Sequence, residues 1–241
     1  MSLLEQTFNG SSNPADLIEA VKSRSLEEVA RLLANQGIDL NYKDDKGYTA
    51  LIWAARKGYT EIAEKLITAG AQLDEKNNDG DTALSWSACN GNTEIAKKLI
   101  KASASLDEKN NDCSTALIRA AANGHRDIAE KLIEAGAKLN EKNNYGNTAL
   151  IWAARGRNTK IVEKLIEAGA KLDEKNNSGY TALALAKENG HKAVIKMLEK
   201  AIKEQETKEI KAIKEQQQRI LAQVADPALR RKLRVKPIIK L

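Results

Sequence analysis

The chain has 241 residues and a formal net charge of +6, and because only 4% of its residues are aromatic, its core must use small aliphatic side chains. Its two cysteines, Cys89 and Cys113, form no Cys-x-x-Cys motif, which argues against a disulfide framework and favours an intracellular setting. No apolar run approaches the roughly 20 residues of a membrane-spanning helix, and the first residues lack the basic region of a signal peptide.

Three short motifs recur along the chain at one fixed interval of 33 residues. Glu-Lys-Asn-Asn begins at Glu75, Glu108, Glu141 and Glu174, and Thr-Ala-Leu begins at Thr49, Thr82, Thr115, Thr148 and Thr181. Lys-Leu-Ile begins at Lys65, Lys98, Lys131 and Lys164. Such a period indicates a solenoid, in which each unit buries its apolar face only against its neighbours.

One period, residues 46–78, shows the elements that each unit should contain. Thr49 is a candidate N-cap of a first helix, and Gly58 is a candidate residue to end it. A second helix should begin near Thr60 and stop at Gly70, followed by an extended arm. Apolar residues recur at helical spacing in both helices, at Leu51, Ala54, Ala55, Ile62, Ala63, Leu66 and Ile67.

Residues 47–55 (Gly-Tyr-Thr-Ala-Leu-Ile-Trp-Ala-Ala), Gly58 and residues 69–74 together resemble the ankyrin-repeat consensus, and the resemblance extends over about residues 13–198. It implies an all-α ankyrin-repeat solenoid of stacked helix-turn-helix units with hairpin loops. The expected organisation is a flexible N-terminus (1–12), an ankyrin-repeat domain (13–201), a C-terminal helix (202–225) and a basic tail (226–241). Within the domain we expect an N-terminal capping unit at 13–45 and repeats at 46–78, 79–111, 112–144, 145–177 and 178–201.

Three positions depart from the glycine pattern of the other repeats. Cys113 stands at a turn glycine, Ser103 stands at the glycine after the second helix, and Gly156-Arg157 shifts a glycine by one residue. These departures leave the turn geometry open, and we expect the middle of the stack to be its least stable part.

Proteins of this family usually bind their partners through the hairpin tips and the concave face of the first helices. Trp53, Trp86 and Trp152 share one repeat position, where Arg119 stands in the third repeat. Tryptophan, tyrosine and arginine are enriched among residues that dominate binding energy. The candidate protein-binding residues are Tyr48, Trp53, Arg56, Lys57, Trp86, Arg119, Trp152, Arg155 and Tyr180.

These residues suggest an acidic, amphipathic protein segment as the partner, with indoles covering its apolar groups and arginines pairing with its carboxylates. The alternative is that the tryptophans mainly pack against the next repeat. The Glu-Lys-Asn-Asn tips are interpreted as a solvated rim of alternating charge, and His125 and His191 as structural residues.

No known catalytic pattern or phosphate-binding loop occurs in the sequence. The two histidines and two cysteines stand at unlike repeat positions, which argues against a zinc site. We therefore expect a monomeric, intracellular, non-enzymatic scaffold or adaptor with no catalytic residue, no metal and no cofactor.

The C-terminal segment differs from the repeats in composition. Residues 199–225 have high helix propensity and carry a partial apolar stripe. The final 16 residues carry a net charge of +5, to which Arg230, Arg231, Lys232, Arg234 and Lys236 contribute. Four functional interpretations of this tail stay open: a nuclear-import or nucleic-acid patch, an anchor to anionic membrane, a docking peptide, or a bacterial secretion signal such as some ankyrin-repeat effectors carry. A solvated tail without a specific partner is the alternative.

Overall fold

The structure is a computed structural model that describes residues 13–35 and 37–225, with the side chains of residues 221–225 excepted. Its described residues are all-α, with hairpin loops between helix pairs. The helices are α1 (Pro14–Lys22), α2 (Leu26–Leu33), α3 (Ala50–Lys57), α4 (Thr60–Thr68), α5 (Ala83–Asn90), α6 (Thr93–Lys101), α7 (Ala116–Asn123), α8 (Arg126–Glu134), α9 (Ala149–Arg155), α10 (Thr159–Glu167), α11 (Ala182–Glu188) and α12 (Lys192–Ala225).

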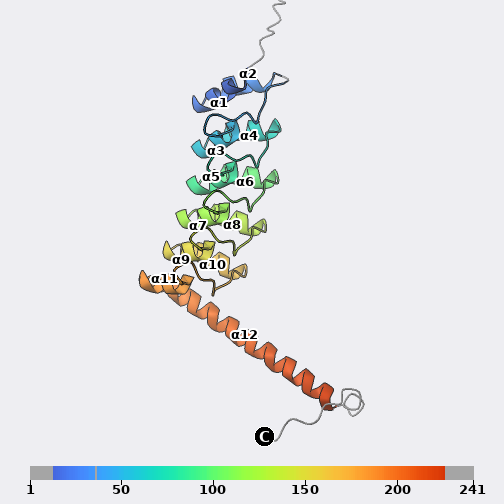
Figure 1. Ribbon diagram of the computed structural model, residues 1–241, viewed down its shortest axis with the longest axis vertical. Coiled ribbons are helices and arrows are strands. Elements are labelled where there is room, and N and C mark those ends of the chain that lie inside the picture. The colour runs from blue at the N-terminus through green and yellow to red at the C-terminus, as the bar shows by residue number, and fades with distance from the viewer. Residues whose placement is uncertain (1–12, 36, 226–241) are drawn as a thin grey trace, which may run out of the picture. The chain divides into compact units, whose positions relative to one another are not determined.

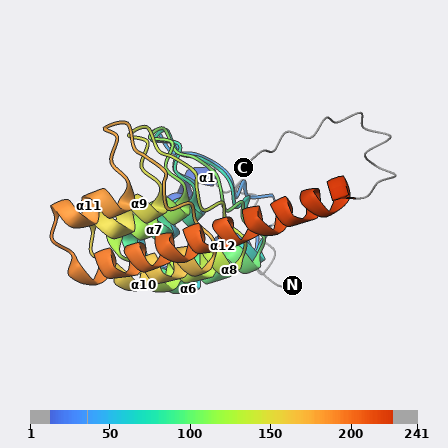
Figure 2. The same ribbon diagram turned by 90° about the horizontal axis from the view of Figure 1, so that it is seen from below.

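The helix pairs stack one on the next in chain order (Figure 1). The first helices of successive units contact one another from α1 and α3 through α9 and α11, and the second helices do the same from α2 through α10. Figure 2 shows the two resulting layers, with the hairpin loops leaving the stack together on the side of α7 and α9. The fold expected from the 33-residue period, an all-α solenoid of paired helices, is confirmed.

The first helices of the five repeats, α3, α5, α7, α9 and α11, each start at a threonine, as the sequence predicts. The hydroxyl oxygen of Thr49 accepts a hydrogen bond from the backbone N–H of Ile52 at 3.2 Å, and Thr82, Thr115, Thr148 and Thr181 make the equivalent bond. This bond satisfies one of the N–H groups that a helix start leaves without a partner. Gly58 ends α3 in the left-handed conformation, with φ of 76°.

The core consists of small and branched aliphatic residues, as the composition requires. Leu51, Ala54, Ala55, Ile62 and Leu66 are 2% exposed or less, and the same positions are buried in the next three repeats. The prediction was wrong in two details. Ile67 lies only half-buried at the edge of the stripe, and Tyr48 is an aromatic residue within the core, 4% exposed.

The three departures from the glycine pattern keep the backbone geometry of the other repeats. Ser103, Cys113 and Arg157 have φ values of 68°, 56° and 59°, in the left-handed region that glycine adopts most easily. A residue with a Cβ is strained there by about 1 kcal/mol. The stack therefore imposes its turn geometry at these positions at a local cost in stability.

The second asparagine of each Glu-Lys-Asn-Asn motif joins its hairpin to the preceding one. The backbone N–H of Asn78 donates to the carbonyl of Lys46 at 3.0 Å, and its side-chain amide donates to the carbonyl of Asp45 at 3.1 Å. Asn111, Asn144 and Asn177 repeat both bonds, each with the hairpin before it. These asparagines are structural links between repeats, a role that the interpretation as a solvated rim had missed.

The chain divides into two compact units, Met1–Ile195 and Lys196–Leu241. The described part of the second unit is the continuation of α12, which runs without interruption through the expected boundary at residues 201 and 202. Ile210, Ile213 and Ile220 on this helix are more than half exposed. None of the helices within the described residues is long and apolar enough to cross a membrane.

Candidate protein-binding surface

The candidate residues lie on the first helices and the hairpin tips that precede them. Trp53, Trp86, Arg119 and Trp152 occupy the same turn of α3, α5, α7 and α9. We call the surface formed by these helices and the adjoining hairpin tips the concave surface, after the face that the ankyrin resemblance implies. The side chains of all four residues are partly exposed on it.

The N-terminal part of the concave surface is a cluster of aromatic rings around one arginine. The rings of Tyr48 and Trp53 lie 4.8 Å apart between centroids, and those of Tyr48 and Trp86 lie 6.2 Å apart. The guanidinium carbon of Arg56 lies 5.3, 5.2 and 4.9 Å from the centroids of Tyr48, Trp53 and Trp86. A cation this close to several aromatic faces is attracted by each of them. Arg56 therefore packs as part of the cluster.

Tyr48 needs a correction as a candidate contact residue. Sequence reasoning grouped it with Tyr180 because both precede a capping threonine. Tyr48 is only 4% exposed because the two indoles cover it, whereas Tyr180 is 40% exposed in the last repeat, where Leu185 replaces tryptophan. Tyr48 thus supports the surface from below, and of the two tyrosines only Tyr180 is open to a partner.

Asp44 holds the first indole in place. Its Oδ2 accepts a hydrogen bond from Trp53 Nε1 at 2.8 Å, while its Oδ1 accepts from the backbone N–H groups of Lys46 and Tyr48. Burial acts to raise the pKa of Asp44, but these hydrogen bonds and the nearby Lys22 ammonium outweigh it and lower the pKa. The carboxylate therefore stays ionised and fixes the ring.

Arg119 differs from the expectation that it would pair with a partner's carboxylate. Its guanidinium pairs with Asp81 of the preceding hairpin and lies 5.1 Å from the ring centroid of Trp86. Burial lowers the pKa of Arg119, but the hydrogen bond and charge of Asp81 outweigh it and raise the pKa. Because Asp81 is itself buried, this pair links the second and third repeats, and Arg119 is removed from the set of free cations.

The remaining candidate cations are available on the surface. Lys57 and Arg155 are exposed and Arg56 is half-buried, and within the described residues none of the three forms an ion pair. The guanidinium of Arg155 lies 5.3 Å from the ring centroid of Trp152, and the Lys57 ammonium lies 5.9 Å from that of Trp53. Two separate pairs of cation and half-exposed indole therefore stand toward the two ends of the concave surface.

Comparisons with known proteins agree with this architecture. Family models described as ankyrin repeats match residues 32–85, 64–143 and 117–209, and so extend over most of the chain. The chain belongs to the ankyrin-repeat family. The crystal structure of EF0377, an ankyrin-repeat protein, is 32% identical with a TM-score of 0.74, and the match covers 77% of this chain and 97% of that one. The search of curated proteins gave no match.

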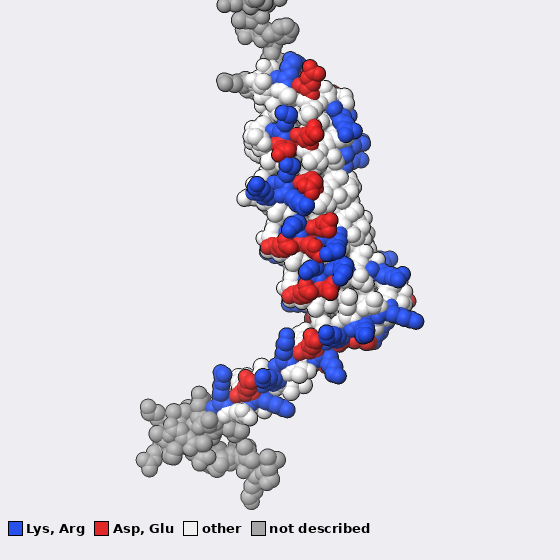
Figure 3. Space-filling model, turned by 180° about the vertical axis from the view of Figure 1, so that it is seen from behind, with Lys and Arg blue, Asp and Glu red and all other residues white. Residues whose placement is uncertain are grey.

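Successive ankyrin hairpins are joined at their tips by a ladder of ion pairs. Lys43 pairs with Glu75 at 2.6 Å, and the same pairing to the next hairpin joins Lys76 to Glu108, Lys109 to Glu141 and Lys142 to Glu174. Figure 3 shows positive and negative side chains interspersed along one face of the stack. The alternating charges expected at the tips are present, and they are paired between repeats.

The two histidines make contacts that are typical of structural positions. His125 Nε2 lies 3.0 Å from the carbonyl oxygen of Cys89, and His191 Nδ1 lies 3.0 Å from that of Ala154. At the same repeat position, the side-chain amides of Asn92 and Asn158 donate to carbonyls of the preceding ankyrin repeat. Histidine and asparagine thus perform the same linking role here.

Sequence reasoning missed the acidic side of the concave surface. Asp79, Asp81 and Asp112 lie at the hairpin tips beside Arg119. In the sequence they differ from the equivalent positions of other repeats only in residue type. The sequence feature that could have indicated this acidic side is an arginine, Arg119, at the position of the tryptophans, with Asp112 at the hairpin tip before it. The basic-tail residues Arg230, Arg231, Lys232, Arg234 and Lys236 lie outside the described residues.

Proposed function

We propose that this ankyrin-repeat chain is a non-enzymatic scaffold that binds a protein partner through its concave surface and hairpin tips. The observation that supports it best is the set of half-exposed indoles, Trp53, Trp86 and Trp152, which occupy one repeat position on α3, α5 and α9. Aromatic residues of this kind supply large contact area at low entropic cost, and their repetition suits an extended ligand.

The cations near the two ends of this surface define the chemistry of the partner. Lys57 and Arg155 project from the last turns of α3 and α9, beside Trp53 and Trp152. Each combines an apolar ring with a positive charge that has no acidic partner within the described residues. An amphipathic segment that carries carboxylates fits this pattern, as the sequence indicated.

Selection from a displayed library of random peptides tests this function. Wild-type protein should enrich peptides that contain apolar residues and carboxylates, and Lys57→Glu/Arg155→Glu should bind the enriched peptides about tenfold more weakly, since each lost charge pair contributes a few-fold. The matched control is Lys65→Glu/Lys101→Glu, which reverses two exposed cations in the last turns of α4 and α6. If Lys57→Glu/Arg155→Glu bound the enriched peptides as tightly as the control variant does, the concave surface would be excluded as the binding site.

A second candidate function concerns the tail. The net charge of +5 over the last 16 residues favours binding of this segment to nucleic acid or anionic membrane, with the ankyrin stack as an adaptor. Nuclear import and delivery as an effector of an intracellular bacterium through the same segment stay hypotheses.

A further inference from the structure

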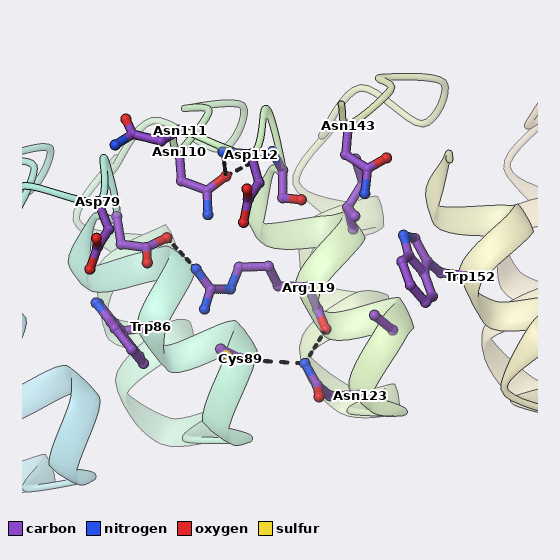
Figure 4. Close-up of a pocket in the computed structure, with 14 residues that line it drawn as sticks. Asp79, Trp86, Cys89, Asn110, Asn111, Asp112, Arg119, Asn123, Asn143 and Trp152 are labelled. Atoms are coloured by element: carbon purple, nitrogen blue, oxygen red, sulfur yellow. Dashed lines mark hydrogen bonds and ion pairs between the residues drawn. The ribbon is translucent and has the colours of Figure 1, made fainter. Parts of the chain in front are cut away.

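A hollow of about 410 Å³ lies at the centre of the concave surface, between α5, α7 and the hairpin tips above them (Figure 4). Trp86 borders it at one end and Trp152 at the other, and Arg119 crosses its floor. Its rim carries Asp79 and Asp112. Pockets of several hundred Å³ with a few polar groups are the usual size for small ligands or single inserted side chains.

The hollow exists because the second and third repeats depart from the flanking repeats at two positions of the first helix. Arg119 replaces the tryptophan of the other repeats, and its side chain extends away from Trp152 toward Asp81 (Figure 4). One turn further along the helices, Cys89 and Ala122 stand where the flanking repeats carry Arg56 and Arg155. Smaller or displaced side chains at both positions leave space that a fourth indole and a further arginine would fill.

The charge of the hollow is negative. Asp81 is neutralised by Arg119, whereas Asp79 and Asp112 are exposed and form no ion pair within the described residues. No group of three or more acidic, histidine or cysteine side chains in the described chain is arranged to hold a metal ion. Two carboxylates beside an indole instead suit an organic cation, which an aromatic face also attracts.

The walls also hold hydrogen-bond donors that lack an acceptor. The indole N–H groups of Trp86 and Trp152 are buried and have no partner within the described residues. Asn143 is 8% exposed, and its Oδ1 already accepts two backbone N–H groups of its own hairpin. Figure 4 shows the Trp152 indole nitrogen on the side of the ring that faces Asn143. Leaving a buried donor unpaired costs free energy, and because both nitrogens are inaccessible to solvent, this cost falls on the folded chain itself.

We propose that the hollow is a subsite for one arginine or lysine residue of the protein partner. The cationic end pairs with Asp112, which lies between Asp79 and Trp152, and the aliphatic part lies against Trp152 (Figure 4). Asp79 adds a second negative charge on the rim.

This inference rests on the proposed function, because it specifies one residue of the partner that the concave surface binds. Lys57 on α3 and Arg155 on α9 lie to either side of the acidic hollow in the order of the repeats. The partner segment therefore carries carboxylates on both sides of a single basic residue. Such an alternating pattern fixes the register of an extended ligand, because a shifted segment would place like charges together.

The test uses N-acetyl-arginine amide as a probe, followed by NMR of the ¹⁵N-labelled indole groups in the full chain. The Trp152 indole resonance, identified with Trp152→Phe, should shift and saturate in the millimolar range, which is typical of a single weakly bound side chain. The amide of N-acetyl-citrulline has nearly the same shape without the charge, and it should give no saturable shift. Binding of both probes alike, or of neither, would overturn the proposal.

Two pairs of variants locate the site. Asp79→Asn/Asp112→Asn should weaken arginine amide binding about fivefold, since each exposed ion pair contributes only a few-fold. Glu27→Gln/Glu61→Gln removes the same charge from exposed positions of α2 and α4 and should leave binding unchanged. Unchanged binding in the first pair would refute the subsite. If binding of arginine amide is unchanged but the library peptides still need Lys57 and Arg155, only the subsite is refuted. If the library peptides do not need Lys57 and Arg155, the proposed function is refuted.

Discussion

One hairpin position decides whether an indole N–H is satisfied. Asp44 offers two oxygens, one for the backbone of its own turn and one for Trp53 Nε1. Asn77 occupies the same position in the next repeat, and its single oxygen is taken by the backbone of its turn. The Asn77 amide and the Trp86 indole N–H are therefore both buried donors without an acceptor. Asparagine in place of aspartate at this position thus removes the hydrogen bond that fixes the indole in the first repeat.

We expect Asn77→Asp and Asn143→Asp to raise the melting temperature. Each restores the acceptor that Asp44 provides for Trp53, and satisfying a buried donor contributes about 1 kcal/mol, or a few degrees in a chain of this size. Thermal unfolding followed by circular dichroism measures the effect.

Asn176→Asp is the matched control for these two variants. Leu185 stands at the tryptophan position of that repeat, and the Asn176 amide donates to Asn147 Oδ1 at 3.0 Å. The control should therefore gain nothing or lose stability. A rise equal to that of Asn77→Asp would show that general charge effects, and not the indole, explain the change.

Backbone strain at single residues gives a second prediction. Ser103 has φ of 68°, whereas the equivalent Gly136 has φ of 90° and nothing within 4 Å of an added Cβ. Ser103→Gly should stabilise the chain by about 1 kcal/mol, and Gly136→Ser should destabilise it by a similar amount. Urea unfolding of both variants checks this reciprocity. Two changes of the same sign would mean that contacts of the serine side chain outweigh the strain.

At the scale of elements, the hairpins are joined by hydrogen bonds and ion pairs of unequal weight. The asparagine bonds satisfy backbone carbonyls and recur at every junction from Asp45 to Asn177. The ion pairs at the tips involve partly exposed side chains, which contribute roughly 0–1 kcal/mol each in water. The ladder therefore adds modestly to junctions that the asparagines already define.

The ladder makes part of the stability depend on pH. The hydrogen bond and charge of Lys109 lower the pKa of Glu141, and Lys142 does the same for Glu174. A carboxyl whose pKa is lower in the folded state stabilises fully above its unfolded pKa of about 4.3, and this contribution is lost as the pH falls through the folded value.

Lys109→Gln/Lys142→Gln should therefore lower the melting temperature slightly at neutral pH, and the difference from wild type should shrink below about pH 4. Melting curves across pH at low salt measure it, and salt at about 1 M should reduce it through screening. Lys65→Gln/Lys101→Gln, which breaks no ion pair in the described chain, should show no such pH dependence. A difference that stays constant with pH would exclude the carboxylates as its source.

The period predicted the helices, their caps and the aliphatic core, because those features depend on residues close in sequence. The burial of Tyr48 was not predictable in this way, since it requires Trp86 of the next repeat to cover the ring. The pairing of Arg119 with Asp81 spans 38 residues and depends on which side chain the neighbouring hairpin presents. The concave hollow follows from that pairing, so local patterns could not reveal it.

At the scale of the whole molecule, charge is segregated along the sequence. Residues 1–198 carry equal numbers of basic and acidic side chains, whereas residues 226–241 carry six basic residues and one acidic residue. A neutral stack with interspersed signs has little general attraction for polyanions, because opposite charges cancel beyond a Debye length. Any such attraction should therefore depend on the last 16 residues.

Binding to a labelled single-stranded oligonucleotide and to phosphatidylserine vesicles tests this dependence. The full chain should bind either polyanion with an affinity that falls with salt, with a log–log slope no steeper than about −4 for six cations on single strands. A chain ending at Ala225 should bind neither, while Arg230→Gln/Arg231→Gln/Lys232→Gln should give about half the slope, because it retains three of the six basic residues. If the shortened chain keeps the full slope, the anion-binding surface lies elsewhere. Salt-sensitive binding to only one of the two polyanions would decide between the nucleic-acid and membrane interpretations of the tail.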